Sequence, residues 1–235
     1  RETVLQMRVI AGHPSRPTPS FQDEIRQIVF NPSWSVPHTI AVEDLLPAQQ
    51  SDPDFFSRLG IRVFRGSGAG ARELDARRID WQRLGPERFP YRLLQTPGPL
   101  NSLGRYKLVM DNPWDIYLHD TPSRRLFELS SRTLSSGCIR LEQPEALVQL
   151  LLAGTPLPAG TEDGTRTRTV TLPRPIPVYI VYLTSWVTPT GEVNFRPDVY
   201  GRDAGLRESA ASRSRPPKEP QDGSTRAQRA CGRRQ

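Results

Sequence analysis

Two short stretches of the sequence carry its strongest structural and chemical signal. They read IYLHDTP at residues 116–122 and SSGCIRL at residues 135–141. A cysteine is a useful nucleophile only as its thiolate, and a nearby imidazole can hold the proton that the thiol gives up. Gly137 leaves room beside the Cys138 sulfur for a substrate carbonyl, and the backbone N–H groups around these two residues could face a developing oxyanion. Cys138 and His119 are therefore candidates for a nucleophile and its base.

Each of these residues also has an ordinary structural explanation. Cys138 stands beside Ile139 and Leu141, where a cysteine is commonly a small buried hydrophobe. His119 ends an apolar segment and fits a core histidine, and Arg140 fits one half of an ion pair. Taken one at a time, the residues leave both explanations open.

The pattern around the two motifs predicts a mostly β fold. Short apolar runs bounded by Gly, Pro and Asn are typical of strands, and they outnumber the predicted helices. Strands and long helices do not alternate regularly, which argues against a parallel α/β fold. The predicted strands are Val4–Ile10, Ile25–Phe30, Ile61–Phe64, Tyr91–Gln95, Tyr106–Met110, Asp115–Leu118, Val178–Leu183 and Glu192–Phe195.

The character of the chain changes at about residues 39–90. Capping residues predict helices at Thr39–Leu46 and Pro53–Leu59, and a Gly- and Arg-rich loop follows the second helix. This stretch therefore predicts a small inserted subdomain. One more helix is expected at Pro144–Ala153, where Pro144 begins it and Gly154 ends it.

Charge and composition limit the classes of partner. The 235 residues carry a net charge of +7, but residues 207–235 contain eight basic and three acidic residues and few apolar ones. This segment is expected to be a disordered basic tail, because it cannot offset its ordering entropy. A nucleic-acid reader needs its basic face on the folded part, so nucleic-acid binding is not expected. Cys231 lies in the tail, and Cys138 is therefore predicted to be a free thiol. No apolar run is long enough for a membrane span.

The combination of motifs resembles the L,D-transpeptidases, the family with a YkuD-like catalytic domain. The resemblance rests on HDTP at residues 119–122, SGCIR at residues 136–140 and the gap of 19 positions from His119 to Cys138. Further segments are similar to the large, cap-bearing periplasmic members of the YcbB type, and the resemblance spans about residues 4–202. These segments are NPSWSVP at residues 31–37, FPYR at 89–92, PGPLNSLG at 97–104 and LEQPEAL at 141–147.

The resemblance implies a β-sandwich catalytic domain over residues 1–206, interrupted by a capping insertion at about residues 39–90. It also implies roles for individual residues. Cys138 is the expected nucleophile, His119 its base and Gly137 the glycine of the oxyanion region. Many relatives carry a histidine at the position of Ser136, whereas this chain has serine, as the YcbB type does.

Four residues are expected to bind substrate or to line its pocket: Arg140, Tyr117, Trp34 and Ser136. Arg140 is expected to orient the donor substrate or to brace the loop that carries the nucleophile, since a guanidinium recognises carboxylates bidentately. Tyr117 would share a strand face with His119 and could line the pocket, and Trp34 fills a matching place in the family pattern; for both, core packing remains an alternative. Asp120 would point to the opposite face, so a backbone carbonyl is the expected partner of the second imidazole nitrogen.

The implied reaction joins peptidoglycan stem peptides. The Cys138 thiolate would attack the carbonyl before the terminal D-alanine of a tetrapeptide donor, and an amine of an acceptor stem would resolve the thioester into a 3→3 cross-link. The resemblance further implies no cofactor and no metal, a location in the periplasm or cell envelope, and covalent inhibition by carbapenem β-lactams. An L,D-carboxypeptidase, a cross-link hydrolase and a non-catalytic peptidoglycan-binding module remain open, and the oligomeric state is not predicted.

Overall fold

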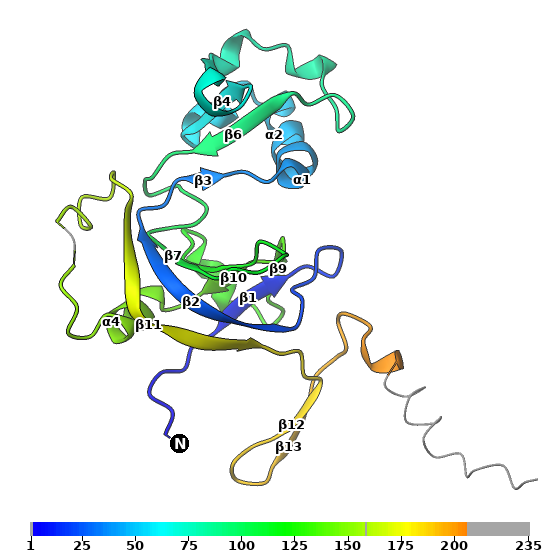
Figure 1. The fold of residues 1–235 in the computed structure, drawn as a ribbon. Coiled ribbons are helices and arrows are strands. Elements are labelled where there is room, and N and C mark those ends of the chain that lie inside the picture. The colour runs from blue at the N-terminus through cyan, green and yellow to red at the C-terminus, as the bar shows by residue number, and fades with distance from the viewer. Residues whose placement is uncertain (1, 158, 206–235) are drawn as a thin grey trace, which may run out of the picture. The chain divides into compact units, whose positions relative to one another are not determined.

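The computed structural model describes residues 2–157 and 159–205, and these residues divide after Tyr182 into two compact units. The described chain is mostly β, as its sequence predicts (Figure 1). The predicted basic tail of residues 207–235, including Cys231, lies outside the described residues. None of the helices within the described ranges has the length and apolar character needed to cross a bilayer.

The first unit contains a seven-stranded sheet in the order β11-β2-β7-β8-β10-β1-β9. Neighbouring strands are antiparallel, except that β8 runs parallel to β10 and β1 runs parallel to β9. Strand β1 therefore lies between β9 and β10, although these two strands follow one another along the chain. The strands are β1 (Val9–Gly12), β2 (Phe21–Phe30), β7 (Tyr106–Val109), β8 (Leu118–His119), β9 (Thr133–Ser135), β10 (Ile139–Leu141) and β11 (Arg168–Ile180).

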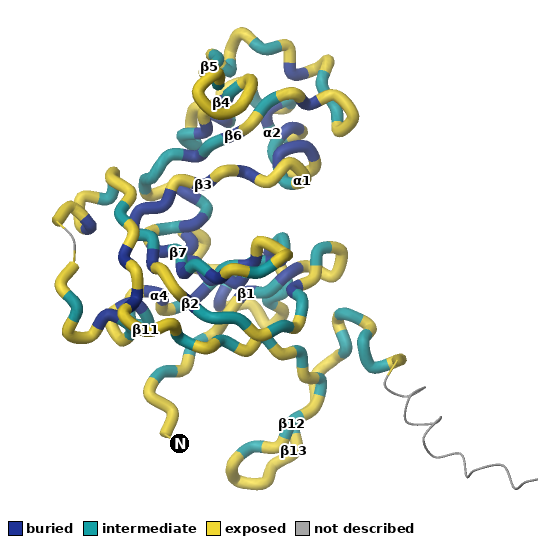
Figure 2. The backbone as a smooth tube through the Cα atoms, viewed as in Figure 1, coloured by how far each residue is buried: buried dark blue, intermediate teal, exposed yellow. Residues whose placement is uncertain are grey.

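The main hydrophobic core lies against one face of this sheet. Alternation along β7 buries Tyr106 and Leu108 in this core and directs Lys107 to the other face. Helix α4 (Pro144–Leu151) begins at a proline, whose missing N–H has no partner in a first helical turn, and its Val148 packs into the same core. Figure 2 shows the buried segments as dark blue stretches of the chain.

A second hydrophobic core forms at the place of the predicted insertion. It has its own four-stranded sheet in the order β3-β6-β4-β5, and it takes in residues on both sides of the predicted 39–90 segment, from Trp34 to Leu103. Phe56, fully buried, packs edge-on against Trp81 with ring centroids 5.1 Å apart. The strands are β3 (Trp34–Ser35), β4 (Ile61–Arg65), β5 (Arg72–Leu74) and β6 (Tyr91–Gln95). The helical segments are α1 (His38–Ile40), η1 (Ala41–Leu45), α2 (Leu46–Ser51), α3 (Phe55–Arg58), η2 (Gly68–Gly70), η3 (Ala76–Arg78) and η4 (Trp81–Arg83).

Several predicted elements differ from the observed ones. The strand predicted at Asp115–Leu118 is reduced to β8, because Asp115 has a left-handed backbone with φ of 56° and ends a turn. The helix predicted at Thr39–Leu46 continues to Ser51 and widens to a π-helix at η1, which ends two residues before Pro47, a residue that lacks an amide hydrogen. The strand predicted at Val178–Leu183 ends at Ile180 but begins ten residues earlier, at Arg168.

The second unit contains one hairpin. Strand β12 (Ser185–Val187) pairs with β13 (Val193–Phe195) around the Thr190-Gly191 turn. The sequence predicts β13, within Glu192–Phe195, but not β12.

Candidate active site

Cys138 lies at the end of a tight turn that joins β9 to β10. The turn needs a glycine, because Gly137 has φ of 110° and a Cβ there would lie 3.1 Å from the Ile116 Cδ1 atom. Cys138 itself is half-buried and packs against the edge of the main core. It is a free thiol.

Hydrogen bonds from neighbouring loops hold this turn in place. The Ser135 hydroxyl donates to the Cys138 carbonyl at 2.6 Å and accepts from the Gly137 amide at 3.2 Å. The buried Thr18 hydroxyl donates to the Gly137 carbonyl at 2.7 Å. The Gly137 amide is already bonded to the Ser135 hydroxyl. The predicted contribution of Gly137 to an oxyanion hole therefore stays a prediction.

Ser136 connects the turn to the second core. Its hydroxyl accepts a hydrogen bond from Arg16 Nη1 at 2.8 Å, and the same guanidinium makes a bidentate pair with the Asp44 carboxylate of η1 at 2.7 and 2.9 Å. In this structure Ser136 therefore anchors the turn that carries Cys138, and its predicted contact with substrate stays a prediction.

His119 is buried, with 5% of its surface exposed, and its ring orientation is fixed by the backbone. The Nδ1 atom lies 2.5 Å from the Asp120 carbonyl oxygen, which confirms the expected backbone partner. Since a carbonyl only accepts, Nδ1 carries the proton and Nε2 has the free lone pair. Burial, and after it the positive charges of Arg140 and Lys107, lower the pKa of His119 to about 3, so the imidazole is neutral at physiological pH.

The Asp120 carboxylate is directed away from the imidazole, as expected. It is buried and accepts hydrogen bonds from the backbone amides of Arg105 and Thr121 and from the Arg124 guanidinium, at 2.8, 2.6 and 2.6 Å. These contacts hold the chain at the end of β8 and therefore hold the carbonyl to which His119 is bonded.

The register of β8 and β10 determines which side chains meet. Arg140 pairs with His119, and the Ile139 amide donates to the Tyr117 carbonyl at 3.1 Å, so Tyr117 is the residue beside Cys138. The Tyr117 and His119 rings lie 5.6 Å apart, edge to face. Leu118 and Ile139, which alternate with these residues, point into the main core.

The thiol does not donate to the imidazole in this structure. Cys138 Sγ lies 3.7 Å from the Asp115 carbonyl oxygen, and among the described residues no hydrogen bond joins it to His119. The predicted pairing of sulfur and imidazole stays a prediction for the substrate-bound enzyme, since catalytic hydrogen bonds often tighten only with substrate. Burial raises the pKa of the Cys138 thiol, while hydrogen bonds from the Tyr117 amide and hydroxyl and the charge of Lys107 act in the opposite direction.

The other predicted residues lie around this group. Trp34 is buried in the second core, beside the Tyr117 hydroxyl. Tyr117 packs against the same core, and this burial raises the pKa of its hydroxyl. Arg140 is half-buried in β10, and no carboxylate within the described ranges forms an ion pair with it. The predicted contact of Arg140 with substrate stays a prediction.

The sequence reasoning missed Lys107. This residue pairs with His119 across β7 and β8, and its ammonium lies 3.8 Å from the centroid of the Tyr117 ring. The sequence did contain a signal for this residue. Lys107 stands between two apolar residues of a predicted strand and is one of only two lysines in the chain.

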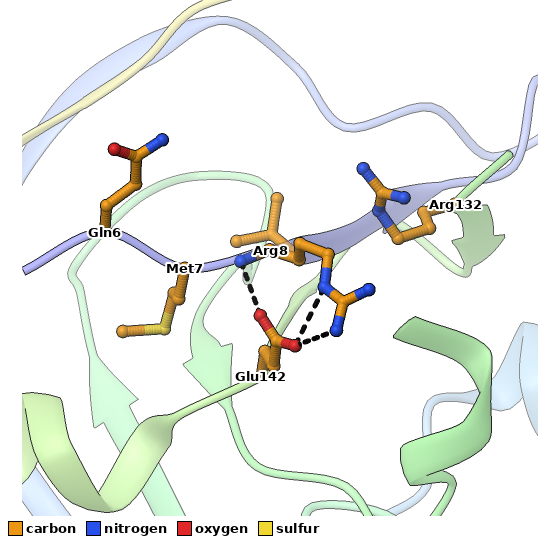
Figure 3. Close-up of a pocket in the computed structure, with 6 residues that line it drawn as sticks. Gln6, Met7, Arg8, Arg132 and Glu142 are labelled. Carbon is orange, nitrogen blue, oxygen red and sulfur yellow. Dashed lines mark hydrogen bonds and ion pairs between the residues drawn. The ribbon is translucent and has the colours of Figure 1, made fainter. Parts of the chain in front are cut away.

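A cavity of about 650 Å³ lies elsewhere on the first unit, by β1 and the end of β10 (Figure 3). The Arg8 side chain and backbone amide both bond to the Glu142 carboxylate on its wall. No cysteine or histidine lines it, and its lining residues are Gln6, Met7, Arg8, Val9, Arg132 and Glu142. Within the described chain, no group of three or more His, Cys, Asp and Glu residues could hold a metal ion.

Comparisons with known proteins identify the family of the chain. The family of L,D-transpeptidase catalytic domains, YkuD, matches residues 1–180. A curated protein of Haemophilus influenzae named "Putative L,D-transpeptidase" is 37% identical over 211 residues, which cover 86% of this chain and 41% of the relative. The chain thus spans about two fifths of the length of the curated relative it matches. With its mostly β fold, and with His119 in β8 and Cys138 directly before the neighbouring strand β10 in the matched region, the chain belongs to the YkuD family of L,D-transpeptidase catalytic domains.

Proposed function

We propose that this chain is a cysteine L,D-transpeptidase that forms a thioester with a peptidoglycan tetrapeptide stem, releases D-alanine and makes 3→3 cross-links in the periplasm or cell envelope. The observation that carries the proposal is the position of Cys138. Its half-buried thiol lies directly before β10, the strand that pairs with the strand of the buried, neutral His119, in the region that matches the family.

The first step uses the free lone pair of His119. Since Nδ1 donates to the Asp120 carbonyl, Nε2 accepts the thiol proton. The sulfur attacks the carbonyl carbon before the terminal D-alanine, a C–S bond forms and the C–N bond breaks. The proton held on Nε2 then passes to the departing amine, so that D-alanine leaves neutral at nitrogen and the enzyme keeps a thioester.

The resting enzyme holds the thiol and the imidazole in their neutral forms. Burial disfavours both charged forms, because it raises the pKa of Cys138 and lowers that of His119. Proton transfer is therefore coupled to substrate binding, which places the carbonyl carbon beside the sulfur and supplies an electrophile for the developing thiolate. A thiol kept neutral between turnovers is also less exposed to oxidation.

The second step replaces D-alanine by the amine of an acceptor stem. The amine attacks the thioester carbonyl and loses its proton to Nε2. Nε2 then gives this proton to the sulfur as the C–S bond breaks. Water in the same position would give carboxypeptidation. Tyr117 and Trp34 connect the second core to the site, and we assign this core the task of limiting water there.

Intact-mass analysis with a tetrapeptide donor tests the proposal. The wild type should gain the mass of the donor minus D-alanine on Cys138, and an added acceptor stem should convert this adduct to a cross-linked product. Cys138→Ala should form no adduct, and a carbapenem should label the wild type but not this variant. Release of D-alanine with hydrolysis alone, despite abundant acceptor, would make the protein a carboxypeptidase. Absence of any adduct would leave a non-catalytic module.

A further inference from the structure

Three basic side chains form one row across the centre of the seven-stranded sheet. Lys107 of β7 pairs with His119 of β8, and His119 pairs with Arg140 of β10. Paired residues on neighbouring strands project to the same face, so the row lies on the face opposite to Leu108, Leu118 and Ile139 of the main core. Tyr117 and Cys138 precede His119 and Arg140 by two residues each, so they lie beside the row on the same face.

The two permanent cations of this row have no carboxylate partner. In the part of the chain that the structure describes, neither Lys107 nor Arg140 makes an ion pair, and the Arg140 Nε atom is buried without a hydrogen-bond partner. Other arginines near the site do pair, as Arg124 does with Asp120 and Arg16 with Asp44. The Lys107 ammonium lies over the face of the Tyr117 ring.

Such an arrangement is unfavourable unless an anion completes it. A charge taken out of water without a partner raises the free energy of the folded state. Burial accordingly lowers the pKa of both Lys107 and Arg140, and the charge of the Cys138 thiolate acts on each in the opposite direction. Paired cations kept half-buried beside a nucleophile are typical of a site for an anionic group of the substrate.

We propose that Lys107 and Arg140 together bind the terminal carboxylate of the residue that leaves the donor, and so select donors with a free carboxylate one residue beyond the scissile bond. This inference rests on the proposed function. In the donor, only the leaving residue has its carboxylate within one peptide unit of the attacked carbonyl. Cys138 and Arg140 are two positions apart, about 7 Å along an extended strand, and one unit of extended peptide spans about 3.3 Å. The long Arg140 and Lys107 side chains cover the remaining distance. The guanidinium of Arg140 and the ammonium of Lys107 together bind a carboxylate.

The pair can first be tested without any peptide. Iodoacetate and iodoacetamide alkylate the same thiolate, but only iodoacetate carries a carboxylate. Relative to a short cysteine peptide, the wild type should favour iodoacetate, with alkylation measured by mass on the fragment that contains Cys138. Lys107→Gln and Arg140→Gln should each reduce this preference about tenfold, which corresponds to one charge-assisted contact. Using the ratio of the two rates cancels any change in the amount of thiolate.

Two variants serve as controls. Lys107→Arg keeps the charge and should keep the preference for iodoacetate, which excludes a general effect of altering this position. Arg174→Gln removes one positive charge from an exposed position of β11 and should behave as the wild type. A preference that stays at the wild-type value in both Lys107→Gln and Arg140→Gln would overturn the cationic pair.

The donor itself then identifies which carboxylate is bound. Acylation should be about 10 to 100 times slower with a tetrapeptide whose terminal carboxylate is amidated, and this difference should shrink in Lys107→Gln and Arg140→Gln. Sensitivity only to amidation of another carboxylate of the stem would overturn the assignment to the leaving residue. If no donor acylates the wild type, the proposed function fails, while the ratio of iodoacetate to iodoacetamide still decides whether the pair binds carboxylates.

Discussion

Tyr117 lies beside Cys138 across the parallel pairing of β8 and β10, while His119 lies one step further along and pairs with Arg140. The Cys138 sulfur is therefore next to the amide and hydroxyl of Tyr117, and the His119 imidazole is next to the cations Lys107 and Arg140. This division suggests separate tasks: Tyr117 supports the negative charge on sulfur, and His119 carries the proton.

Removing the Tyr117 hydroxyl should make the thiolate harder to form. This hydroxyl acts to lower the pKa of Cys138, against the larger effect of burial. In Tyr117→Phe the pKa of the thiol should rise, and alkylation by iodoacetamide at pH 8 should slow by roughly fivefold, the value of one hydrogen bond. Tyr106→Phe removes a hydroxyl from the core face of the same sheet and should leave the rate unchanged. Equal rates in wild type and Tyr117→Phe would remove the assigned task of Tyr117.

His119 should make the fold sensitive to acid before the carboxylates titrate. Its pKa is lowered to about 3 in the folded protein, whereas an unfolded histidine has a pKa of about 6.5. Between these values the unfolded chain binds the extra proton, so this contribution to stability is complete above pH 6.5 and is lost as the pH falls toward 3.

The loss can be measured by urea denaturation at pH 7, 6 and 5. The free energy of unfolding should fall by up to about 1.4 kcal/mol per pH unit from this residue alone. In His119→Gln this part of the slope should disappear. A slope identical in both proteins over this range would show that the imidazole can be protonated without loss of the fold.

The Gly137 turn should not tolerate a side chain. In Gly137→Ala the residue must keep a positive φ, and its Cβ meets Ile116 at 3.1 Å. The free energy of unfolding should fall by about 1–3 kcal/mol, and alkylation of Cys138 should change because the turn shifts. Gly154→Ala is the matched control, since Gly154 has φ of 80° but nothing within 4 Å of a Cβ. If the two variants lose the same stability and Cys138 reacts normally in both, contact with Ile116 plays no part.

Arg16 and Asp44 should be coupled, but weakly. Their side chains are 28% and 38% exposed, so the pair belongs to the class of ion pairs worth about 0.5–1 kcal/mol. A double-mutant cycle with Arg16→Gln and Asp44→Asn should give this coupling at low salt and less at 1 M salt, where charges are screened. Ser136→Ala tests the other arm of Arg16 and should leave the coupling with Asp44 in place. A coupling of zero at low salt would contradict the observed pairing.

The sequence predicted those strands whose pattern is local. Tyr91–Gln95 was predicted with the observed bounds, because its alternation and flanking turn residues are complete within the segment. Only the last three of the 13 residues of β11 are within the predicted strand Val178–Leu183, because Pro173 and Pro175 argue against a strand before them. The structure accommodates them where the register of β11 against β2 shifts, between Thr171 and Ile176, so that these prolines need not donate to the ladder.

The candidate site was predicted less completely than the fold. Motif and resemblance identified Cys138 and His119, but which residue stands opposite the sulfur depends on the register of β8 against β10, which no local pattern encodes. Lys107 joins the site only because β7 is the other neighbour of β8. The contact of Arg16 with Ser136 spans 120 residues and depends on tertiary structure alone.

Strand β1 has a consequence for where the protein can be shortened. It fills the gap between β9 and β10, and the loop that follows it supplies the Thr18 hydroxyl that holds the Gly137 carbonyl. A truncated form beginning at β2 would retain every residue of both motifs and yet leave the two strands around the nucleophile without their common neighbour. We therefore expect a fragment that begins at β2 to lose the support of the turn that carries Cys138, although the residues before β2 contain neither motif.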